Sequence, residues 1–367
     1  MPYGSVNADV ITTSTAGGVL GAGNASIMKN RIINGAMVID QRNAGASVAN
    51  AGQYTLDRWS AYGSSTSKFT IQQNAGSITP PVGFTNYLGV TSSAATSLGA
   101  SDEYEISQKI EGYNVADLGW GSANAKTVTL SFWVRSSLTG TFGGTATNAT
   151  YTYSYPFSYT ISSANTWEQK SITITGPTSG TNFGTTNGIG IYLAFSLGAG
   201  STVSGTANTW ASAYYAQPTG ATSVVGTNGA TFYITGVQLE VGSSATGYEY
   251  VNYQTSLANC QRYYESITYS SGAEGVVMGF CQSSTIARYA FPIVAKRTAP
   301  TMAYSGTLAV EFANGSVTNV TGIGSQAYGG GSVASLYFTV ASGLTAGQAC
   351  CLYANGTAVS ITFSSEL

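Results

Sequence analysis

The stretch Thr127-Val128-Thr129-Leu130-Ser131-Phe132-Trp133-Val134-Arg135 decides the fold class of this chain. Successive side chains of a β-strand point to opposite faces of the sheet, so residues two apart share a face. The residues that share the apolar face of this stretch are Val128, Leu130, Phe132 and Val134. Strict alternation of this kind predicts a strand with one buried face.

Other stretches between residues 36 and 250 show the same alternation. They are residues 188–197, the pair Ile172 and Ile174, the row from Tyr104 to Ile110, and residues 232–239. In the last of these the apolar phase changes at Gly236, which predicts a β-bulge. Turn-forming pairs separate the stretches, at Thr139-Gly140, Asn165-Thr166 and Asn228-Gly229. Many short strands joined by tight turns predict an all-β fold, with a jelly-roll β-sandwich over residues 36–250.

The composition excludes several classes of function. The chain has no His, and only 8% of its residues are charged. Without His, the usual general base near neutral pH and the commonest metal ligand are both missing, which removes Ser-His triads and most zinc sites. The formal net charge of −2 gives no basic surface for nucleic acid. We expect no nucleic-acid partner, no resident metal, no cofactor and no catalytic residues.

The N-terminal part, residues 1–35, begins with low-complexity runs of small residues, at 12–18 and 21–24. Such a segment is too small and flexible to bury a core of its own, so we expect an extended arm that a partner holds in place. No stretch approaches the roughly 20 apolar residues of a membrane-spanning helix, and the pattern of a secretory signal is missing. We therefore expect no membrane insertion.

Residues 251–367 are expected to form a smaller, sandwich-like C-terminal β tip domain. A short helix is predicted at about residues 255–265, because Leu257, Cys260 and Tyr264 fall on one helical face. Strands are predicted at residues 308–312, 335–340 and 359–363.

All four cysteines lie in this last third of the chain. The adjacent residues Cys350 and Cys351 would point to opposite faces of a strand, which does not fit a disulfide framework. We favour buried free thiols in a protein made in a reducing cytoplasm, with a disulfide between Cys260 and Cys281 as the alternative.

Four parts of the chain carry a resemblance to a known class of proteins. Residues 30–43, from Asn30 to Asn43, resemble the opening of tailed-bacteriophage tail fibre and virion appendage proteins. The segment Cys260-Gln261-Arg262-Tyr263-Tyr264 is similar to one that follows the jelly roll in such proteins, and residues 291–301 look like part of their distal domain. The middle region resembles the jelly-roll modules of phage fibres and of carbohydrate-binding modules.

The resemblance implies a structural protein of a phage virion, assembled in the host cytoplasm and located on the tail or capsid surface. It implies a homotrimeric tail fibre or receptor-binding protein, which docks onto other virion proteins through its arm and contacts host cell-surface glycan through its distal domains. The residues implied in virion anchoring are Asn30, Arg31, Ile32, Ile33, Asn34 and Arg42. A capsid-decorating or head-fibre protein built from the same modules is the first alternative.

Tyr and Trp side chains are the candidate glycan contacts, because aromatic faces stack on sugar rings. The stretch Tyr151-Thr152-Tyr153-Ser154-Tyr155 is expected to place three Tyr on one strand face, although such a face can equally pack on a neighbour. The candidate glycan-contact residues are Tyr151, Tyr153, Tyr155, Trp210, Tyr214, Tyr215 and Tyr328.

Two further alternatives rest on acidic side chains. A pair of carboxylates across a cleft suffices for glycoside hydrolysis, which would make the chain a glycan-cleaving tailspike enzyme. The cluster Asp102, Glu103 and Glu105 could instead bind calcium, although no EF-hand-type loop supports it. The remaining acidic candidates are Asp57, Glu111, Asp117 and Glu240. No spacing selects a catalytic pair, so a non-enzymatic role is favoured.

Overall fold

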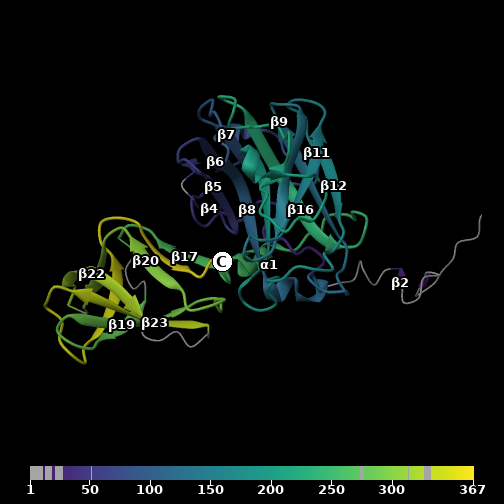
Figure 1. Cartoon of the computed structure of the whole chain (residues 1–367). Helices are drawn as coiled ribbons and strands as arrows, with labels where there is room; N and C mark the ends of the chain where they lie inside the picture. The colour runs from purple at the N-terminus through teal and green to yellow at the C-terminus, as the bar shows by residue number, and fades with distance from the viewer. Residues whose placement is uncertain are drawn as a thin grey trace, which may run out of the picture.

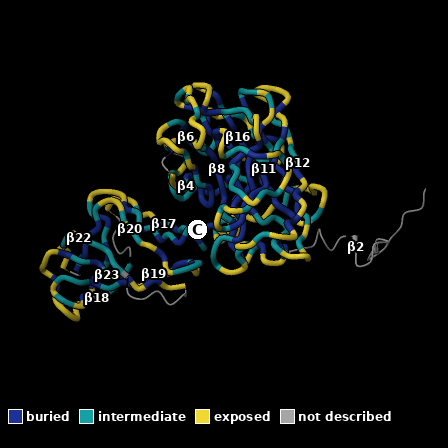
Figure 2. Tube along the Cα trace, viewed as in Figure 1, coloured by how far each residue is buried: buried dark blue, intermediate teal, exposed yellow. Residues whose placement is uncertain are grey.

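The computed structural model describes residues 28–50, 52–272, 277–312, 314–325 and 332–367, together with the backbone of residues 11–12 and 19–20. Most of the regular structure in these residues is β-strand, which confirms the expected all-β class. Two lobes are visible in Figure 1, a body (residues 28–250) and a smaller tip (residues 264–367). In both lobes the strands carry most of the buried residues, while turns and loops are exposed (Figure 2).

The body is a sandwich of two six-stranded antiparallel sheets, here named sheet I and sheet II. Sheet I has the order β11-β10-β13-β8-β5-β4, and sheet II has the order β12-β9-β16-β7-β6-β3. The strands of sheet I are β4 (Gln53–Leu56), β5 (Trp59–Gly63), β8 (Glu103–Glu111), β10 (Gly140–Thr147), β11 (Ser154–Ile161) and β13 (Ile189–Ala199). The strands of sheet II are β3 (Val48–Ala49), β6 (Phe69–Gln73), β7 (Leu88–Ser92), β9 (Val128–Ser136), β12 (Glu168–Ile174) and β16 (Thr231–Val241).

Several short elements complete this part of the chain. A parallel pair is formed by β14 (Ser204–Gly205) and β15 (Gln217–Pro218), and an antiparallel pair by β1 (Ile11–Thr12) and β2 (Val19–Leu20). The 3₁₀ turns are η1 (Ala75–Ser77), η2 (Gly112–Asn114), η3 (Ala116–Leu118) and η4 (Ser201–Val203).

The local sequence predictions for the body are confirmed where they concern strands and turns. The alternating stretch at residues 127–135 forms β9, and the register of β16 against β9 shifts between Thr235 and Gln238, as expected for a bulge. Gly236 has a φ of 62°, and a Cβ atom there would lie 2.6 Å from the ring of Phe84, so glycine is required. Left-handed φ angles confirm the predicted turns at Gly140, Asn165 and Gly229.

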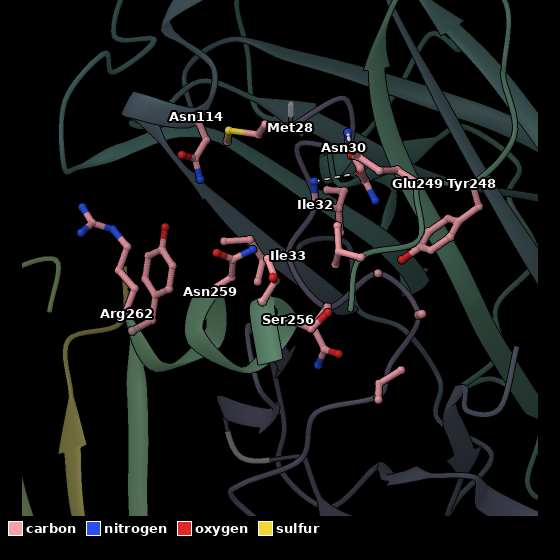
Figure 3. A pocket seen from close by; sticks show the side chains of 17 residues that line it. Met28, Asn30, Ile32, Ile33, Asn114, Tyr248, Glu249, Ser256, Asn259 and Arg262 are labelled. Carbon is pink, nitrogen blue, oxygen red and sulfur yellow. Dashed lines mark hydrogen bonds between the residues drawn. The ribbon is translucent and has the colours of Figure 1, made fainter. Parts of the chain in front are cut away.

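Residues 28–38 lie beside Tyr248 and the helix α1 (Tyr253–Gln261), as Figure 3 shows. The Asn30 side chain bridges to β16, because its Nδ2 donates to Val237 O at 3.0 Å and its Oδ1 accepts from Leu239 N at 3.0 Å. These two bonds hold the segment against β16 at and just after its bulge. The start of the body therefore moves from the expected residue 36 to residue 28.

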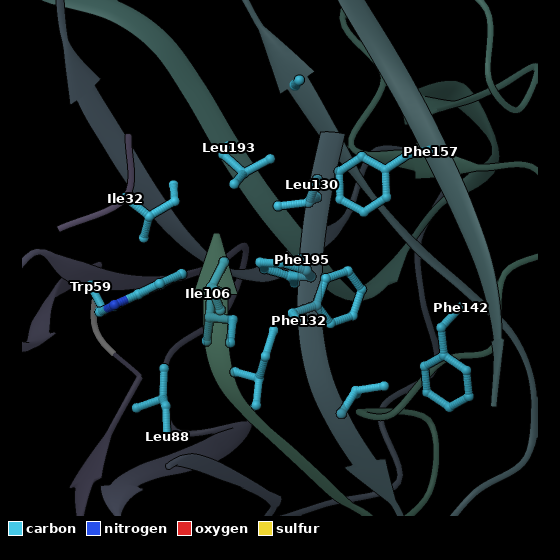
Figure 4. Close-up of a cluster of buried hydrophobic side chains, with 14 of the residues drawn as sticks. Ile32, Trp59, Leu88, Ile106, Leu130, Phe132, Phe142, Phe157, Leu193 and Phe195 are labelled. Carbon is cyan, nitrogen blue, oxygen red and sulfur yellow. The ribbon is translucent and has the colours of Figure 1, made fainter. Parts of the chain in front are cut away.

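The core lies between the two sheets (Figure 4). Phe132 of sheet II lies 4.9 Å from Phe195 of sheet I, ring centroid to ring centroid, and Trp59 lies 6.4 Å from Phe195. All three are fully buried, and each contributes about 1.5–3 kcal/mol to stability on burial. Ile32 packs into the same cluster, so the opening segment is part of this core. The rest of the expected arm, residues 1–27, lies outside the described residues except for the backbone of β1 and β2.

The tip consists of a closed six-stranded barrel and a three-stranded sheet. The barrel strands are β18 (Met278–Cys281), β19 (Ile286–Pro292), β21 (Leu308–Glu311), β22 (Val317–Ser325), β23 (Val333–Val340) and β24 (Ala349–Ala354). The sheet strands are β17 (Tyr264–Tyr269), β20 (Thr301–Ser305) and β25 (Val359–Ser364). The three strands predicted in this region are confirmed as β21, β23 and β25. Closure of the barrel removes the exposed sheet edges that an open sandwich would leave.

The predicted helix is confirmed as α1 (Tyr253–Gln261). Asn252 is its N-cap residue, because the Asn252 side chain accepts a bond from Thr255 N at 2.8 Å. The helix ends four residues earlier than expected, because Tyr264 already belongs to β17. All four cysteines are free, so the thiol interpretation is confirmed and the alternative disulfide from Cys260 is not formed. No helix in the described part of the chain has the length and apolar character needed to cross a bilayer.

Buried charges join the two lobes in what we name the junction cluster: Arg42, Arg58 and Glu366. Glu366 accepts a bond from Arg42 Nη2 at 2.7 Å through Oε1 and a bond from Arg58 Nη1 through Oε2. The guanidinium of Arg42 lies 3.7 Å from the centroid of the Tyr264 ring, and that of Arg58 lies 3.6 Å from the Tyr263 ring. Only 1% of the Arg58 side chain and 8% of the Glu366 side chain are exposed.

Two more arginines, one in the connection after residue 261 and one in the tip, bind the body. Arg262 binds Glu111 of β8 with two parallel bonds of 2.9 and 2.6 Å. Arg297 donates to Asn187 O at 2.7 Å on the body and to Glu366 O at 2.8 Å. Bidentate and charge-assisted bonds of this kind fix direction as well as distance, so they set the orientation of one lobe against the other.

We expect Glu366→Gln to lower the free energy of unfolding by about 3–5 kcal/mol, because it leaves the buried charge of Arg58 without its anion. Urea denaturation of the whole chain measures this loss. Asp117→Asn is the matched control, since it removes a half-exposed ion pair with Arg31 and should cost no more than about 1 kcal/mol. An equal loss in both variants would show that the junction cluster does not stabilise the fold.

Candidate functional site

A pocket of about 380 Å³ opens on the outer face of sheet I, and we name it the sheet-face pocket. Its walls come from β4, β5, β8 and β13 and from two loops that lie over the sheet. The lining side chains that carry its chemistry are Tyr62, Glu103, Glu105, Tyr151, Tyr192 and Tyr214.

Strand alternation places the two glutamates on the same side of β8. Tyr104 and Ile106 point into the body core, so Glu103 and Glu105 point outward. In the strand register Glu105 lies opposite Tyr62 of β5. The glutamates therefore reach the pocket from its floor, beside a Tyr ring that is 43% exposed.

Loops bring two further Tyr rings over the glutamates. Tyr151 has a left-handed φ of 57°, in a turn where the buried Asn148 side chain accepts a bond from Thr152 N at 2.9 Å. The Tyr151 ring centroid lies 5.1 Å from that of Tyr192 and 5.9 Å from that of Tyr214, edge to face in both cases. The rings thus form one continuous aromatic wall.

Each glutamate in the pocket keeps one carboxyl oxygen without a partner. The Tyr192 hydroxyl donates to Glu105 Oε1, and the Tyr214 hydroxyl is hydrogen-bonded to Glu103. The Oε2 atoms of Glu103 and Glu105 are buried and have no hydrogen-bond partner among the residues that the structure describes. Buried polar atoms are nearly always paired, so these two oxygens mark the place where a ligand can supply donors.

Burial also changes the protonation of the site. Loss of solvent, helped by the negative charge of Glu103, raises the pKa of Glu105 to about 8. Burial raises the pKa of Glu103 as well, and it raises the pKa values of Tyr151, Tyr192 and Tyr214. At neutral pH the Glu105 carboxyl is therefore mostly neutral in the empty pocket.

The structure divides the predicted glycan contacts into two groups. The expectation that Tyr151, Tyr153 and Tyr155 share one strand face is wrong, because β11 begins only at Ser154 and the residues before it form the turn around Asn148. Only Tyr151 and Tyr214 reach the sheet-face pocket.

The other predicted contacts belong to a separate aromatic cluster or lie elsewhere. Tyr153 stacks on Trp210 with the ring planes at 8° and 5.2 Å between centroids, and Tyr155 packs on the same indole at 5.3 Å. These ring faces are covered by one another. Tyr215 is half-buried beside Gly205, and Tyr328 lies outside the described residues.

The remaining acidic candidates do not form a site. Asp102 accepts a bond from Gly99 N at 2.8 Å and does not line the pocket, so it does not join Glu103 and Glu105 as a calcium ligand. The others have partners within the chain: Asp57 with Gln41, Glu111 with Arg262, Asp117 with Arg31, and Glu240 with Thr246. Among the described residues, no group of three or more acidic or Cys side chains is arranged to hold a metal ion.

A larger cavity, of about 550 Å³, is lined by the residues implied in virion anchoring: Asn30, Ile32, Ile33 and Asn34 (Figure 3). Its charged groups are already occupied within the chain. Glu249 accepts bonds from the backbone N–H groups of Lys29 and Asn30, and Arg262 is paired with Glu111. Of the other two residues implied in anchoring, Arg31 bonds Asn114 O and Asp117, while Arg42 lies in the junction cluster. The sheet-face pocket is thus the better candidate for a ligand.

Sequence reasoning missed Tyr62 and Tyr192 as site residues. Both occupy strands, where an aromatic side chain is usually read as part of the core. The sequence pattern that could have indicated the site lies in β8. Its outward-facing side chains are opposite the predicted apolar row and include two acidic groups: Glu103, Glu105 and Ser107. The strands that lie beside β8 depend on the order of strands in the sheet. The pattern within one strand does not reveal that order.

No family model and no curated protein matches this chain. Among solved structures, the enzymatically active domain of a tailspike protein of bacteriophage CBA120 is 12% identical over 58% of this chain and 22% of its own chain, with a TM-score of 0.32. A family 11 carbohydrate-binding module of a cellulosomal cellulase of Clostridium thermocellum is 11% identical over 56% of this chain and 100% of its own, with a TM-score of 0.27. A xylan-binding domain of Paenibacillus barcinonensis is 10% identical over 56% of this chain and 99% of its own, with a TM-score of 0.24. Since these scores are low, the function proposed below rests on the side chains of the sheet-face pocket.

We expect Glu105→Gln to remove a pH dependence of stability. The folded pKa of about 8 lies above the ordinary value of 4.5, so the stability from the neutral carboxyl is complete below pH 4.5 and is lost as the pH rises through 8. The variant, which keeps an oxygen acceptor for Tyr192, should match the wild type at low pH and exceed it by up to a few kcal/mol above pH 8. Urea denaturation across this range measures the difference, and parallel pH profiles would contradict the assignment.

Proposed function

We propose that this chain is a non-enzymatic structural protein of a phage virion, and that its body binds a host cell-surface glycan in the sheet-face pocket. The observation that carries the glycan site is the pair of unpartnered carboxyl oxygens, on Glu103 and Glu105, in a pocket lined by five Tyr residues. Sugars offer hydroxyl donors to such oxygens and apolar ring faces to aromatic side chains. The volume of about 380 Å³ lies within the range of roughly 300–1,000 Å³ that small-molecule sites occupy.

The placement of the carboxyl groups supports binding rather than cleavage. Glu103 and Glu105 lie two residues apart on one strand, so they approach a bound sugar from the same side. Glycosidases place their two carboxyl groups on either side of the scissile bond, and one of them has to be ionised as base or nucleophile. Burial raises the pKa values of both groups here, which opposes ionisation.

The finer part of the proposal is a homotrimeric tail fibre or receptor-binding protein, which attaches to other virion proteins through its N-terminal arm. Its support is the resemblance of residues 30–43 and 260–264 to phage appendage proteins. The junction cluster adds to this support, because an appendage that presents a tip at a distance needs the tip held in one orientation.

Imaging an intact particle by cryo-electron microscopy tests the virion assignment. We expect three copies of the chain around one axis at the tail. Copies spread over the shell would instead identify a capsid-decorating protein, and absence of the chain from the particle would contradict the virion role. Light scattering of the purified chain gives an independent mass, which should be three times 37.7 kDa.

Tyr62→Ala should weaken glycan binding at least tenfold, because the ring is the most exposed aromatic face in the pocket. Glycans released from a susceptible host are screened first, and binding of the best one is then measured by isothermal titration calorimetry. The matched control is Tyr113→Ala, which removes another exposed ring, 61% exposed, outside the pocket. Equal affinity in the wild type and Tyr62→Ala would place the glycan elsewhere on the chain.

A further inference from the structure

The donors and acceptors of the sheet-face pocket are unevenly distributed. Among the described residues, the buried polar atoms of its lining without a hydrogen-bond partner are the Oε2 oxygens of Glu103 and Glu105, which act as acceptors once the carboxyls are ionised. Glu105 is only 2% exposed and lines the pocket. The one basic side chain in the lining, Lys109, already donates to Leu367 O at 2.7 Å. The buried atoms that a ligand could newly pair with in this pocket are therefore carboxyl oxygens.

The charged and titratable groups around these oxygens come from every neighbouring element. Glu103 and Glu105 lie on β8, Tyr62 on β5 and Tyr192 on β13, while Tyr151 and Tyr214 come from the loops. The cation of the lining, Lys109, also lies on β8 and is bonded to Leu367 O. Burial disfavours ionisation of both carboxyls, and the negative charge of Glu103 adds to this effect at Glu105, so the empty site holds a proton that a cation could replace.

The Tyr rings strengthen the preference for a cation. Aromatic faces carry negative potential, and a cation over or between them is attracted by about 0.5–2 kcal/mol. Here a wall of three Tyr in edge-to-face contact stands beside the two carboxyl groups. An ammonium group has three donors and one positive charge, so it can satisfy both free oxygens at once and offset their charge. A single sugar hydroxyl can donate a hydrogen bond to one of the two oxygens, and it carries no positive charge to offset theirs.

The opposite sign of charge is disfavoured by the same geometry. A uronic or sialic acid would bring a carboxylate beside two carboxyl groups, while the basic side chain of the lining, Lys109, is already bonded to Leu367 O. An acetylated amine would bring an uncharged amide, whose single N–H cannot pair with both oxygens and offsets no negative charge. Repulsion and unpaired acceptors both lower affinity.

We propose that the sheet-face pocket recognises a glycan through a free primary ammonium group, that is, a non-acetylated amino sugar whose nitrogen bridges Glu103 and Glu105. This inference rests on the proposed glycan-binding function and specifies its ligand class. Binding displaces the proton held by Glu105, so the reaction takes up the cationic sugar and releases H⁺ to solvent.

The experiment compares three oligosaccharides of equal length by isothermal titration calorimetry on the full chain: glucosamine, N-acetylglucosamine and glucose tetramers. We expect the glucosamine oligomer to bind at least tenfold more tightly than the other two near neutral pH. The measured heat should vary with the ionisation enthalpy of the buffer, because a proton is released. Glu103→Gln should remove this selectivity, with its fold checked by thermal melting against Glu311→Gln, a substitution in the tip.

The outcomes separate the two proposals. Equal binding of all three oligomers, weakened by Tyr62→Ala, would overturn the ammonium inference and leave glycan binding in place. Binding that requires added calcium and is lost with a chelator would also overturn it, since a metal would then bridge the carboxyl groups. If these oligomers and the host glycans all fail to bind, both the inference and the proposed glycan site fail.

Discussion

The arrangement of the two lobes depends on one buried charge, the guanidinium of Arg58. Its side chain is 1% exposed, and a charge so far from water is tolerated only beside an opposite charge. That charge comes from Glu366, which lies 308 residues further along the chain. The Tyr263 ring covers the other side of the guanidinium. The body therefore buries a cation whose carboxylate partner, among the described residues, comes from the C-terminal segment, and each lobe completes the other.

The pocket shows a second, smaller conflict between burial and charge. The body encloses Glu105 under Tyr151 and Tyr214, although ionisation of this carboxyl would be the normal state near neutral pH. Stability alone would favour an apolar or amide side chain at this position. A group that costs stability in the empty protein and lies in a pocket fits a role in binding, because a ligand can recover the lost interaction.

The strands were predictable from sequence because alternation is a local property. The period-two pattern at residues 127–135 predicts β9, and the change of phase at Gly236 predicts the bulge in β16. The site was less predictable, since it depends on contacts between distant segments. Tyr151 contacts Tyr192 and Tyr153 contacts Trp210, in a turn that is fixed by backbone bonds to the Asn148 side chain. A rule based on strand alternation does not predict such a turn. The start of the body was also not predictable, because it depends on bonds between distant residues. Asn30 follows a low-complexity sequence, and nothing in that sequence indicates the bonds that Asn30 makes to β16.

The neck between the lobes has a mechanical consequence. The strand by which the chain enters the tip, β17, is hydrogen-bonded to the strand by which it returns, β25, with Tyr264 opposite Ser364 at the end nearest the body. A single extended linker can rotate about its own bonds, whereas a hydrogen-bonded sheet, here with β20 on the other side of β25, resists twisting where arginines hold its end. Drag on the tip would therefore act on the body as torque.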